Sequence, residues 1–172
     1  MQVIIPELIK NKRVLLRLDI DVPLAESSVV SHQSSDKKFV VADDFRLKAG
    51  MPTLRLCLEH AEEVIVMGHI GRPNGVDPLL SVGPIYAWLV NQGLGSHLGG
   101  GRLKLLENLR FEKGEEDCDL EYAKQLASLG DFYINEAFAS HHPSSSTTIL
   151  PTLLPHAAGL QFVKEVETLK QI

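Results

Sequence analysis

The sequence predicts an α/β domain in which a parallel β-sheet lies between helices on both of its faces. Along the 172 residues, apolar runs of strand length alternate four times with segments of helical periodicity, an order typical of parallel sheets with helical crossovers. The run Val64-Ile65-Val66-Met67 contains no polar residue, as expected for a strand that is buried on both faces. A chain of this length fits one domain with a proper core.

The strands of the first half are predicted from short apolar runs. Residues 13–19 form the first strand, and residues 64–67 form the central one. Residues 39–41 form a further short strand. It follows an excursion over residues 25–38, in which five serines indicate a solvated loop.

We expect the helical segment between these strands to be interrupted. Residues 45–49 form a brief turn of helix that begins after two aspartates, which are good capping side chains. Gly50 ends that turn, and Pro52 suits the first turn of a new helix that ends near His60.

In the second half, helices are expected around two further strands, which span residues 103–106 and 132–134. Five glycines between residues 93 and 101 indicate a short, flexible link ahead of the first of these strands. The expected helices, in chain order, span residues 81–91, 114–127 and 162–172.

The composition limits the classes of function. The net charge of −5 argues against a general nucleic-acid binder, for which a basic patch is expected. Cys57 and Cys118 are isolated, so neither a disulfide framework nor a metal site is predicted. The first residues are too poor in apolar side chains for a signal peptide, and no apolar run is long enough for a membrane span. We therefore expect a cytoplasmic protein without nucleic-acid or membrane partners.

Polar side chains follow each of the central strands. The carboxyl ends of parallel strands meet at one edge of a sheet, where ligands of open α/β folds bind. Arginine suits an anion there because its planar fork binds carboxylate or phosphate bidentately. The sequence therefore predicts a crevice for a small, multiply charged anion. Its candidate residues are Asp19 and Asp21, His69 and Arg72, Asn108 and Arg110, Asn135 and Glu136, and Arg46 from the following helix.

Six segments in this order resemble the phosphoglycerate kinase family. They are Arg17-Leu18-Asp19-Ile20-Asp21-Val22-Pro23, Asp43-Asp44-Phe45-Arg46, Gly68-His69-Ile70-Gly71-Arg72-Pro73, Leu105-Leu106-Glu107-Asn108-Leu109-Arg110-Phe111, Gly114-Glu115-Glu116 and Asn135-Glu136-Ala137-Phe138. The tail from Ala158 to Glu167 is similar to the segment that leads out of the amino-terminal domain of that family. The resemblance covers almost the whole chain.

The resemblance implies a single Rossmann-like domain over residues 1–172, with three layers and the phosphoglycerate site. It implies a kinase that transfers a phosphoryl group reversibly between 1,3-bisphosphoglycerate and ADP, giving 3-phosphoglycerate and ATP in glycolysis. The family binds Mg-ATP or Mg-ADP on a carboxy-terminal domain that is absent from this sequence. We therefore expect no nucleotide on this chain alone, no turnover without the missing domain, and a monomer.

The resemblance also assigns roles to residues of this chain. Asp19 and Asp21 are expected to hold the hydroxyl and carboxylate region of the substrate. Arg46 is the expected catalytic residue, because it reaches the phosphoryl group in transfer. The expected ligands of the substrate's phosphate or carboxylate are His69, Arg72, Arg110 and His142. Phosphoryl transfer needs such positioning and charge neutralisation more than covalent help.

Two departures from the family pattern affect the expected site. Asp21 stands where the family usually has asparagine, and an added carboxylate repels an anionic substrate unless it is paired or protonated. His142 stands where the family usually has a substrate-binding arginine. A histidine replaces an arginine only when it is protonated, so we expect weaker binding at alkaline pH.

Two other functions are compatible with parts of the sequence. The chain could be a non-catalytic anion-binding fragment or a decayed copy, as the changes at Asp21 and His142 suggest. An apolar strand followed by Asp19-Ile20-Asp21 also resembles the start of a haloacid-dehalogenase-type phosphatase, with Asp19 as the nucleophile and Asp21 as the general acid. That alternative leaves the segments around His69 and Arg110 without a role.

Overall fold

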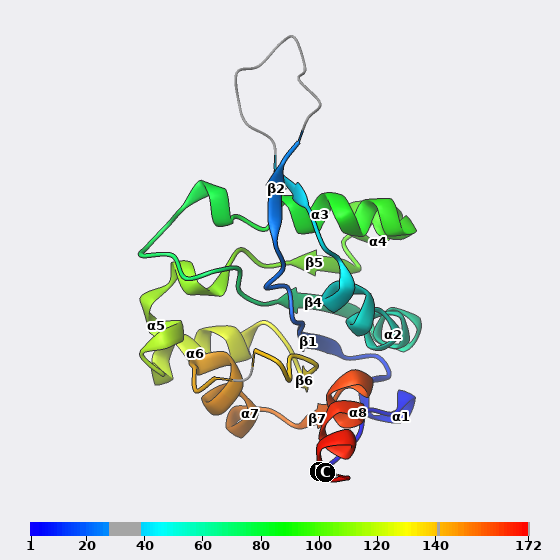
Figure 1. Cartoon of the computed structure of the whole chain (residues 1–172). Helices are drawn as coiled ribbons and strands as arrows, with labels where there is room; N and C mark the ends of the chain where they lie inside the picture. Colours follow the sequence, from blue (N-terminus) through cyan, green and yellow to red (C-terminus); the bar gives the residue numbers. More distant parts are fainter. Residues whose placement is uncertain (28–38, 141, 172) are drawn as a thin grey trace.

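The computed structural model describes residues 1–27, 39–140 and 142–171. Its centre is a five-stranded sheet in the order β5-β4-β1-β6-β7, in which all neighbouring strands run parallel (Figure 1). The predicted parallel α/β sheet is therefore confirmed. Its strands are β1 (Arg13–Arg17), β4 (Glu63–Met67), β5 (Leu103–Leu105), β6 (Phe132–Asn135) and β7 (His156–Ala158).

Helices cover both faces of this sheet, as Figure 1 shows. The helices α1, α2 and α8 lie on one side of it, and α6 and α7 lie on the other. The α-helices are α1 (Pro6–Ile9), α2 (Phe45–His60), α3 (Gly83–Leu89), α4 (Gly95–Gly99), α5 (Lys113–Glu116), α6 (Leu120–Ser128), α7 (Leu150–Leu153) and α8 (Leu160–Leu169). The shorter turns are the 3₁₀ turns η1 (Pro78–Leu80) and η3 (Leu109–Phe111) and the π turns η2 (Val90–Leu94) and η4 (Ser145–Ile149).

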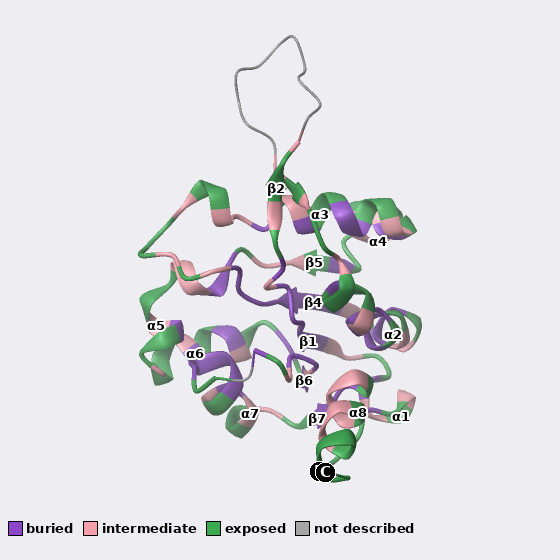
Figure 2. Ribbon diagram, viewed as in Figure 1, coloured by how far each residue is buried: buried purple, intermediate pink, exposed green. Residues whose placement is uncertain are grey.

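Successive residues of each central strand enter different cores, because side chains alternate across a strand. In β1, Val14 and Leu16 belong to the core that α2 and α3 cover. Leu15 belongs to the core that α6 and α7 cover. All three are fully buried, and Figure 2 shows the central strands in the colour of buried residues. The three-layer prediction is thus confirmed by two cores on opposite faces of one sheet.

The expected break in the first long helix is wrong, because α2 continues through both Gly50 and Pro52. A Cβ atom on Gly50 would lie 2.3 Å from a methyl carbon of Leu18, so this glycine lets α2 approach the end of β1 closely. Pro52 is exposed, and so is Lys48, whose carbonyl loses a helical hydrogen bond to the proline. Water is available to that carbonyl, which makes the proline tolerable within the helix.

The boundaries predicted for the second half also need correction. The glycine-rich link is mostly helical: η2 and α4 extend α3, and the chain turns at Gly93 with φ of 82°. The helix expected over residues 114–127 is two helices, because the chain takes a left-handed conformation at Cys118, with φ of 53°. Asp119 then caps α6 by accepting a hydrogen bond from the amide of Tyr122 at 2.8 Å.

Several elements had no counterpart in the sequence-based prediction. Strand β2 (Leu24–Glu26) pairs with β3 (Phe39–Val41) in a separate antiparallel ribbon, while most of the predicted excursion, residues 28–38, lies outside the described part of the chain. Strand β7, at one border of the main sheet, follows α7 and pairs with β6. In the described part of the chain, no helix combines the length and apolarity needed to cross a bilayer.

The candidate functional site

The carboxyl ends of β5, β4, β1 and β6 lie at the same edge of the sheet, which we call the carboxyl edge. Most of the predicted site residues follow these ends directly or within a few residues. Asp19 and Asp21 follow β1, His69 and Arg72 follow β4, and Arg110 follows β5. The parallel topology therefore gathers them at the edge that the sequence indicated. Arg46 and His142 reach it from the first turn of α2 and from the loop after β6.

Asp19 and Arg46 form an ion pair, and both residues line a small cavity. Asp19 is 8% exposed, and its Oδ2 lies 3.3 Å from Nη1 of Arg46. Burial raises the pKa of Asp19 above its ordinary value, although Arg46 opposes that shift. The cavity has a volume of about 240 Å³, and Gly50, Glu136 and Gln161 also line it. A guanidinium that is 45% exposed beside this cavity remains available to an anion.

Asp21, the residue at the family's asparagine position, is bound to the protein through one oxygen. Its Oδ1 accepts a hydrogen bond from the amide of Gly71 at 2.8 Å, in a turn where Gly71 has a φ of 63°. Its Oδ2 lies 3.7 Å from Nε2 of His69. The added carboxylate therefore links the loop after β1 to the loop after β4.

His69 is buried and uncharged. Only 4% of the residue is exposed, and Arg17 donates a hydrogen bond to its Nδ1 at 2.8 Å. Burial, together with the charges of Arg17 and Arg110, lowers the pKa of His69 to about 3. The positive charge of the carboxyl edge therefore comes from the arginines, and His69 can serve only as a neutral hydrogen-bonding group.

Arg17 is a site residue that the sequence argument missed. It is 1% exposed and donates hydrogen bonds to the hydroxyl of Ser146 at 3.0 Å and to the carbonyl of Leu18 at 2.9 Å. Burial lowers the pKa of Arg17. Ser146 in turn donates to the buried carboxylate of Glu115 at 2.6 Å. The signal in the sequence was an arginine directly after the apolar run Val14-Leu15-Leu16, at the end of a buried strand where unpaired charges are rare.

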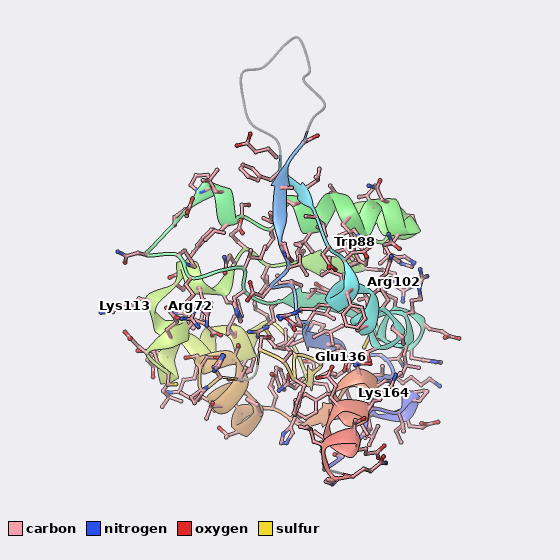
Figure 3. All side chains as sticks on the ribbon, in the orientation of Figure 1. Arg72, Trp88, Arg102, Lys113, Glu136 and Lys164 are labelled. Atoms are coloured by element: carbon pink, nitrogen blue, oxygen red, sulfur yellow. The ribbon has the colours of Figure 1, made fainter. Side chains whose placement is uncertain are left out.

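Arg110 and Arg72 differ in how far the protein already binds them. Arg110 donates from Nη1 to the carbonyl of Gly71 at 2.7 Å, and its Nε lies 3.2 Å from Glu116. Arg72 is exposed and has neither a hydrogen bond nor an ion pair to any other residue that the structure describes. Figure 3 labels Arg72 and Lys113 on the side of the molecule that carries α5. Among the described residues, the guanidinium of Arg72 is thus exposed and unpaired, whereas that of Arg110 is already bound by the protein.

A second cavity, of about 400 Å³, is lined by Arg110 but not by Arg72. Pro73 and Gly75 line it from the loop after β4, and Arg110 and Lys113 line it from the opposite side. Glu116 also lines it, so this cavity has mixed charge.

Asn108 supports the site without facing a ligand. It is 2% exposed, and its amide group donates to the carbonyls of Ile70 and Leu80 at 2.8 and 3.0 Å. Its carbonyl oxygen accepts from the amides of Ile70 and Arg110. Every hydrogen-bonding direction of this amide is therefore used to hold the loops that carry His69 and Arg110.

Glu136 likewise has a supporting role. Its carboxylate accepts hydrogen bonds from the hydroxyl of Thr53 and from the amides of Gln161 and Phe162, at the first turn of α8. Burial raises its pKa to about 7, because desolvation outweighs these three donors. Figure 3 shows Glu136 close to α8. This side chain fixes α8 against α2, the helix that carries Arg46.

His142 lies on the loop after β6 and is exposed. Its amide donates to the carbonyl of Ser140, and its carbonyl accepts from the hydroxyl of Thr147 at 2.5 Å. His142 is among the groups that lower the pKa of His69, after burial and the charges of Arg17 and Arg110. The backbone of this residue is therefore fixed, while its ring remains open to solvent at the edge.

A comparison with known protein families shows which family this chain belongs to. The phosphoglycerate kinase family matches residues 6–99 and 90–172 of the chain. The chain belongs to the phosphoglycerate kinase family. The resemblance in the sequence motifs is therefore confirmed.

Named relatives and solved structures agree with this assignment. The phosphoglycerate kinase of Moorella thermoacetica is 39% identical over 180 residues, covering 94% of this chain and 43% of that protein. The cytosolic phosphoglycerate kinase of Nicotiana tabacum is 35% identical, covering 94% of this chain and 42% of that protein. The structure of phosphoglycerate kinase from Coxiella burnetii superimposes with a TM-score of 0.77 at 27% identity, covering 95% of this chain and 42% of that one. The chain thus spans less than half the length of these relatives.

Family membership also bears on the phosphatase alternative. A phosphatase of this type would need Asp19 as a free nucleophile, but Asp19 forms an ion pair with Arg46. One oxygen of Asp21, its general acid, accepts a hydrogen bond from the amide of Gly71. In the described part of the chain, no three carboxylate, histidine or cysteine side chains are grouped as a metal site. Membership of the phosphoglycerate kinase family therefore argues against the phosphatase alternative.

Proposed function

We propose that residues 1–172 form the phosphoglycerate-binding domain of a phosphoglycerate kinase. The reaction is the reversible transfer of a phosphoryl group between 1,3-bisphosphoglycerate and ADP. The observation that carries this proposal is the pair of open guanidinium groups, Arg46 and Arg72, on the carboxyl edge of an acidic protein. Arginines at such an edge favour a small ligand with several negative charges.

The geometry supports a division of roles among the site residues. Arg72, Arg110 and His142 would bind the phosphate or carboxylate of phosphoglycerate, with His69 as an additional hydrogen-bond donor. Asp19 would hold the hydroxyl region of the substrate, since a carboxylate oxygen accepts a hydrogen bond from a hydroxyl group. Arg46 is 45% exposed above the cavity, and it would neutralise charge on the phosphoryl group during transfer, which is the main requirement of this chemistry.

Asp21 would contact the carboxylate region only through its second oxygen. Its first oxygen binds the amide of Gly71, which lowers but does not remove the repulsion toward an anionic substrate. We therefore propose that this chain binds phosphoglycerate more weakly than a variant with asparagine at position 21.

The nucleotide belongs to the other half of the enzyme in this proposal. Mg-ATP or Mg-ADP is the second substrate, and a carboxy-terminal domain would bind it and close against the carboxyl edge. We expect no kinase turnover from residues 1–172 alone. The protein would act as a monomer in the cytoplasm, and its partners would be phosphoglycerate and the nucleotide-binding domain.

Titration of the labelled chain with 3-phosphoglycerate at low salt, followed by amide correlation spectra, tests the binding role. The expected shifts are concentrated at residues 69–72, at residues 108–111 and near Arg46. Glycerol, which has the hydroxyl groups without the charges, serves as the control and leaves these signals unchanged. A folded chain with no shifts at the carboxyl edge would contradict the proposal.

The second candidate is a domain that binds the anion and takes no part in catalysis. The exposed His142 at the family's arginine position favours it, because a histidine lacks the permanent charge of an arginine. A coupled assay with a separately supplied nucleotide-binding domain distinguishes the two functions. ATP formation from 1,3-bisphosphoglycerate and ADP supports the kinase, and its absence with intact binding supports the non-catalytic domain.

A further inference from the structure

The contact between Arg17 and His69 fixes the position of a proton. Nη2 of Arg17 lies 2.8 Å from Nδ1 of His69, and both residues are buried. A guanidinium has only N–H groups and no acceptor. Nδ1 must therefore accept this hydrogen bond, and it can do so only while it carries no proton of its own.

The proton of the neutral ring consequently lies on Nε2. Oδ2 of Asp21 lies 3.7 Å from Nε2, which is beyond hydrogen-bonding distance. The other oxygen of Asp21 binds the amide of Gly71. The Nε2–H group is therefore unused within the described structure, on the ring edge nearest the loop after β1.

Arg17 cannot easily turn away from this contact. Its Nε donates to Ser146 at 3.0 Å and its Nη1 donates to the carbonyl of Leu18 at 2.9 Å. Ser146 is bound on its other side, because its amide and hydroxyl both donate to the carboxylate of Glu115. The chain from Glu115 through Ser146 to Arg17 lies entirely among buried side chains. It holds the guanidinium in one orientation against the ring.

The charged groups around His69 also disfavour its protonation. Arg17 faces it from β1, Arg110 from η3 and His142 from the loop after β6, and each opposes a positive ring. Asp21 alone favours the charged form. With burial, these groups lower the pKa of His69 to about 3, so the ring carries no charge between pH 5 and 8.

We propose that Arg17 is a positioning residue, which holds His69 in one tautomer so that its Nε2–H donates to a phosphate or carboxylate oxygen of the bound ligand. The identity of that ligand as phosphoglycerate rests on the proposed function. His69 then orients the ligand through one directional hydrogen bond, while the arginines of the carboxyl edge supply the positive charge of the site. A neutral donor of this kind gives the same hydrogen bond throughout the physiological pH range.

Long-range ¹H–¹⁵N correlation spectra of the histidine rings test the tautomer in the free protein. The expected pattern for His69 is a protonated Nε2 and an unprotonated Nδ1 at every pH from 5 to 8. An Nδ1–H tautomer, or a ring that becomes an imidazolium within this range, would overturn the proposal. The spectrum needs no ligand, so a failure of phosphoglycerate to bind would count only against the proposed function.

Arg17→Met tests whether the arginine causes this pattern. The variant removes the donor to Nδ1 and one positive charge, so His69 should populate both tautomers and its pKa should rise. An unchanged His69 spectrum in folded Arg17→Met would overturn the role of Arg17. If this variant does not fold, the wild-type spectrum and the two variants of His69 below still decide the proposal.

His69→Gln and His69→Asn form a matched pair for the donor. The amide nitrogen of glutamine lies near the position of Nε2, whereas that of asparagine lies near Nδ1 and cannot reach the ligand. Phosphoglycerate affinity should fall by less than about tenfold in His69→Gln and by a further tenfold or more in His69→Asn, as expected for loss of one hydrogen bond to a charged group. Equal losses in both variants would contradict the donor role.

Discussion

The carboxyl edge has two parts that differ in how the protein binds their polar groups. The buried network comprises Arg17, His69, Asn108 and Glu115, which are all at most 4% exposed and hydrogen-bonded within the protein. The open rim comprises Arg46, Arg72 and His142, whose side chains are exposed. Arg46 makes one ion pair there, and Arg72 makes none within the described residues.

This difference separates positioning from recognition. The buried network uses its hydrogen bonds to fix the loops after β1, β4 and β5, and it leaves the Nε2–H of His69 as a donor. The open rim keeps its charges in contact with water, where they cost little and remain free to meet an anion. Changes to the network should therefore lower the stability, whereas changes to the rim should alter affinity and leave the stability nearly constant.

The largest expected effect follows from Arg17→Met. The change removes three hydrogen bonds and leaves the carboxylate of Glu115 without its buried counter-charge. Breaking a buried charge network typically costs about 3–5 kcal/mol. Urea unfolding should show a loss of that order in the free energy of unfolding.

The matched control is Arg13→Met at the other end of the same strand. Arg13 makes a two-point contact with Asp131, but both side chains are more than 40% exposed. Exposed ion pairs contribute little, so this variant should unfold close to the wild type. Similar losses in the two variants would contradict the larger contribution of the buried network to stability.

Asn108→Ala should have the next largest effect. It leaves the buried carbonyl of Ile70 and the carbonyl of Leu80 without their donor, and each such loss costs roughly 1–3 kcal/mol. We expect a total loss of about 2–4 kcal/mol in urea unfolding. Asn74→Ala, at an exposed asparagine in the neighbouring loop, is the control. Unchanged stability in Asn108→Ala would show that the loops are held by other contacts.

Glu136, a buried carboxylate outside this network, gives the stability a dependence on pH. Burial raises its pKa from 4.5 to about 7 in the folded protein, so the folded state binds the proton more tightly than the unfolded chain. The stability from this proton is fully present below about pH 4.5 and is lost as the pH rises through 7. The wild type minus Glu136→Gln difference in unfolding free energy should fall across this window by an amount on the order of 1–3 kcal/mol. A flat difference would contradict the burial of the carboxylate.

The smallest expected effect is a gain at the rim. His142→Arg places a permanent charge where a histidine is mostly uncharged at pH 8. Phosphoglycerate affinity at pH 8 should rise by about three- to tenfold, as expected for one solvent-exposed ionic contact. The gain should shrink at pH 5, and the free energy of unfolding should not change. No gain at pH 8 would place His142 outside the site.

The sequence predicted the parallel sheet and the gathering of polar groups at its edge because both depend on local patterns. Apolar strands such as Val64–Met67 are marked by composition, and the groups after them lie at one edge whenever the strands are parallel. The motif resemblance identified the family for a similar reason, since six short segments in order are rare by chance.

The errors arose where distant residues decide the local structure. Gly50 predicts a helix end by propensity, but contact with Leu18 turns it into a packing position within α2. Arg17 looked like a strand residue, because its partners Ser146 and His69 are more than fifty positions away in the chain. Likewise, His69 looked like a cation until its burial and the contact from Arg17 were known.

The central claim is that the open rim binds phosphoglycerate. Calorimetric titration of 3-phosphoglycerate into the wild type, Arg72→Ala and Lys10→Ala at low salt tests it most directly. Arg72 and Lys10 are both exposed, and Lys10 lies at the end of α1. We predict salt-sensitive binding by the wild type and Lys10→Ala, and a loss of about tenfold or more in Arg72→Ala, as expected for one charge-assisted contact. Equal binding by all three proteins, or no binding by a folded wild type, would contradict the account.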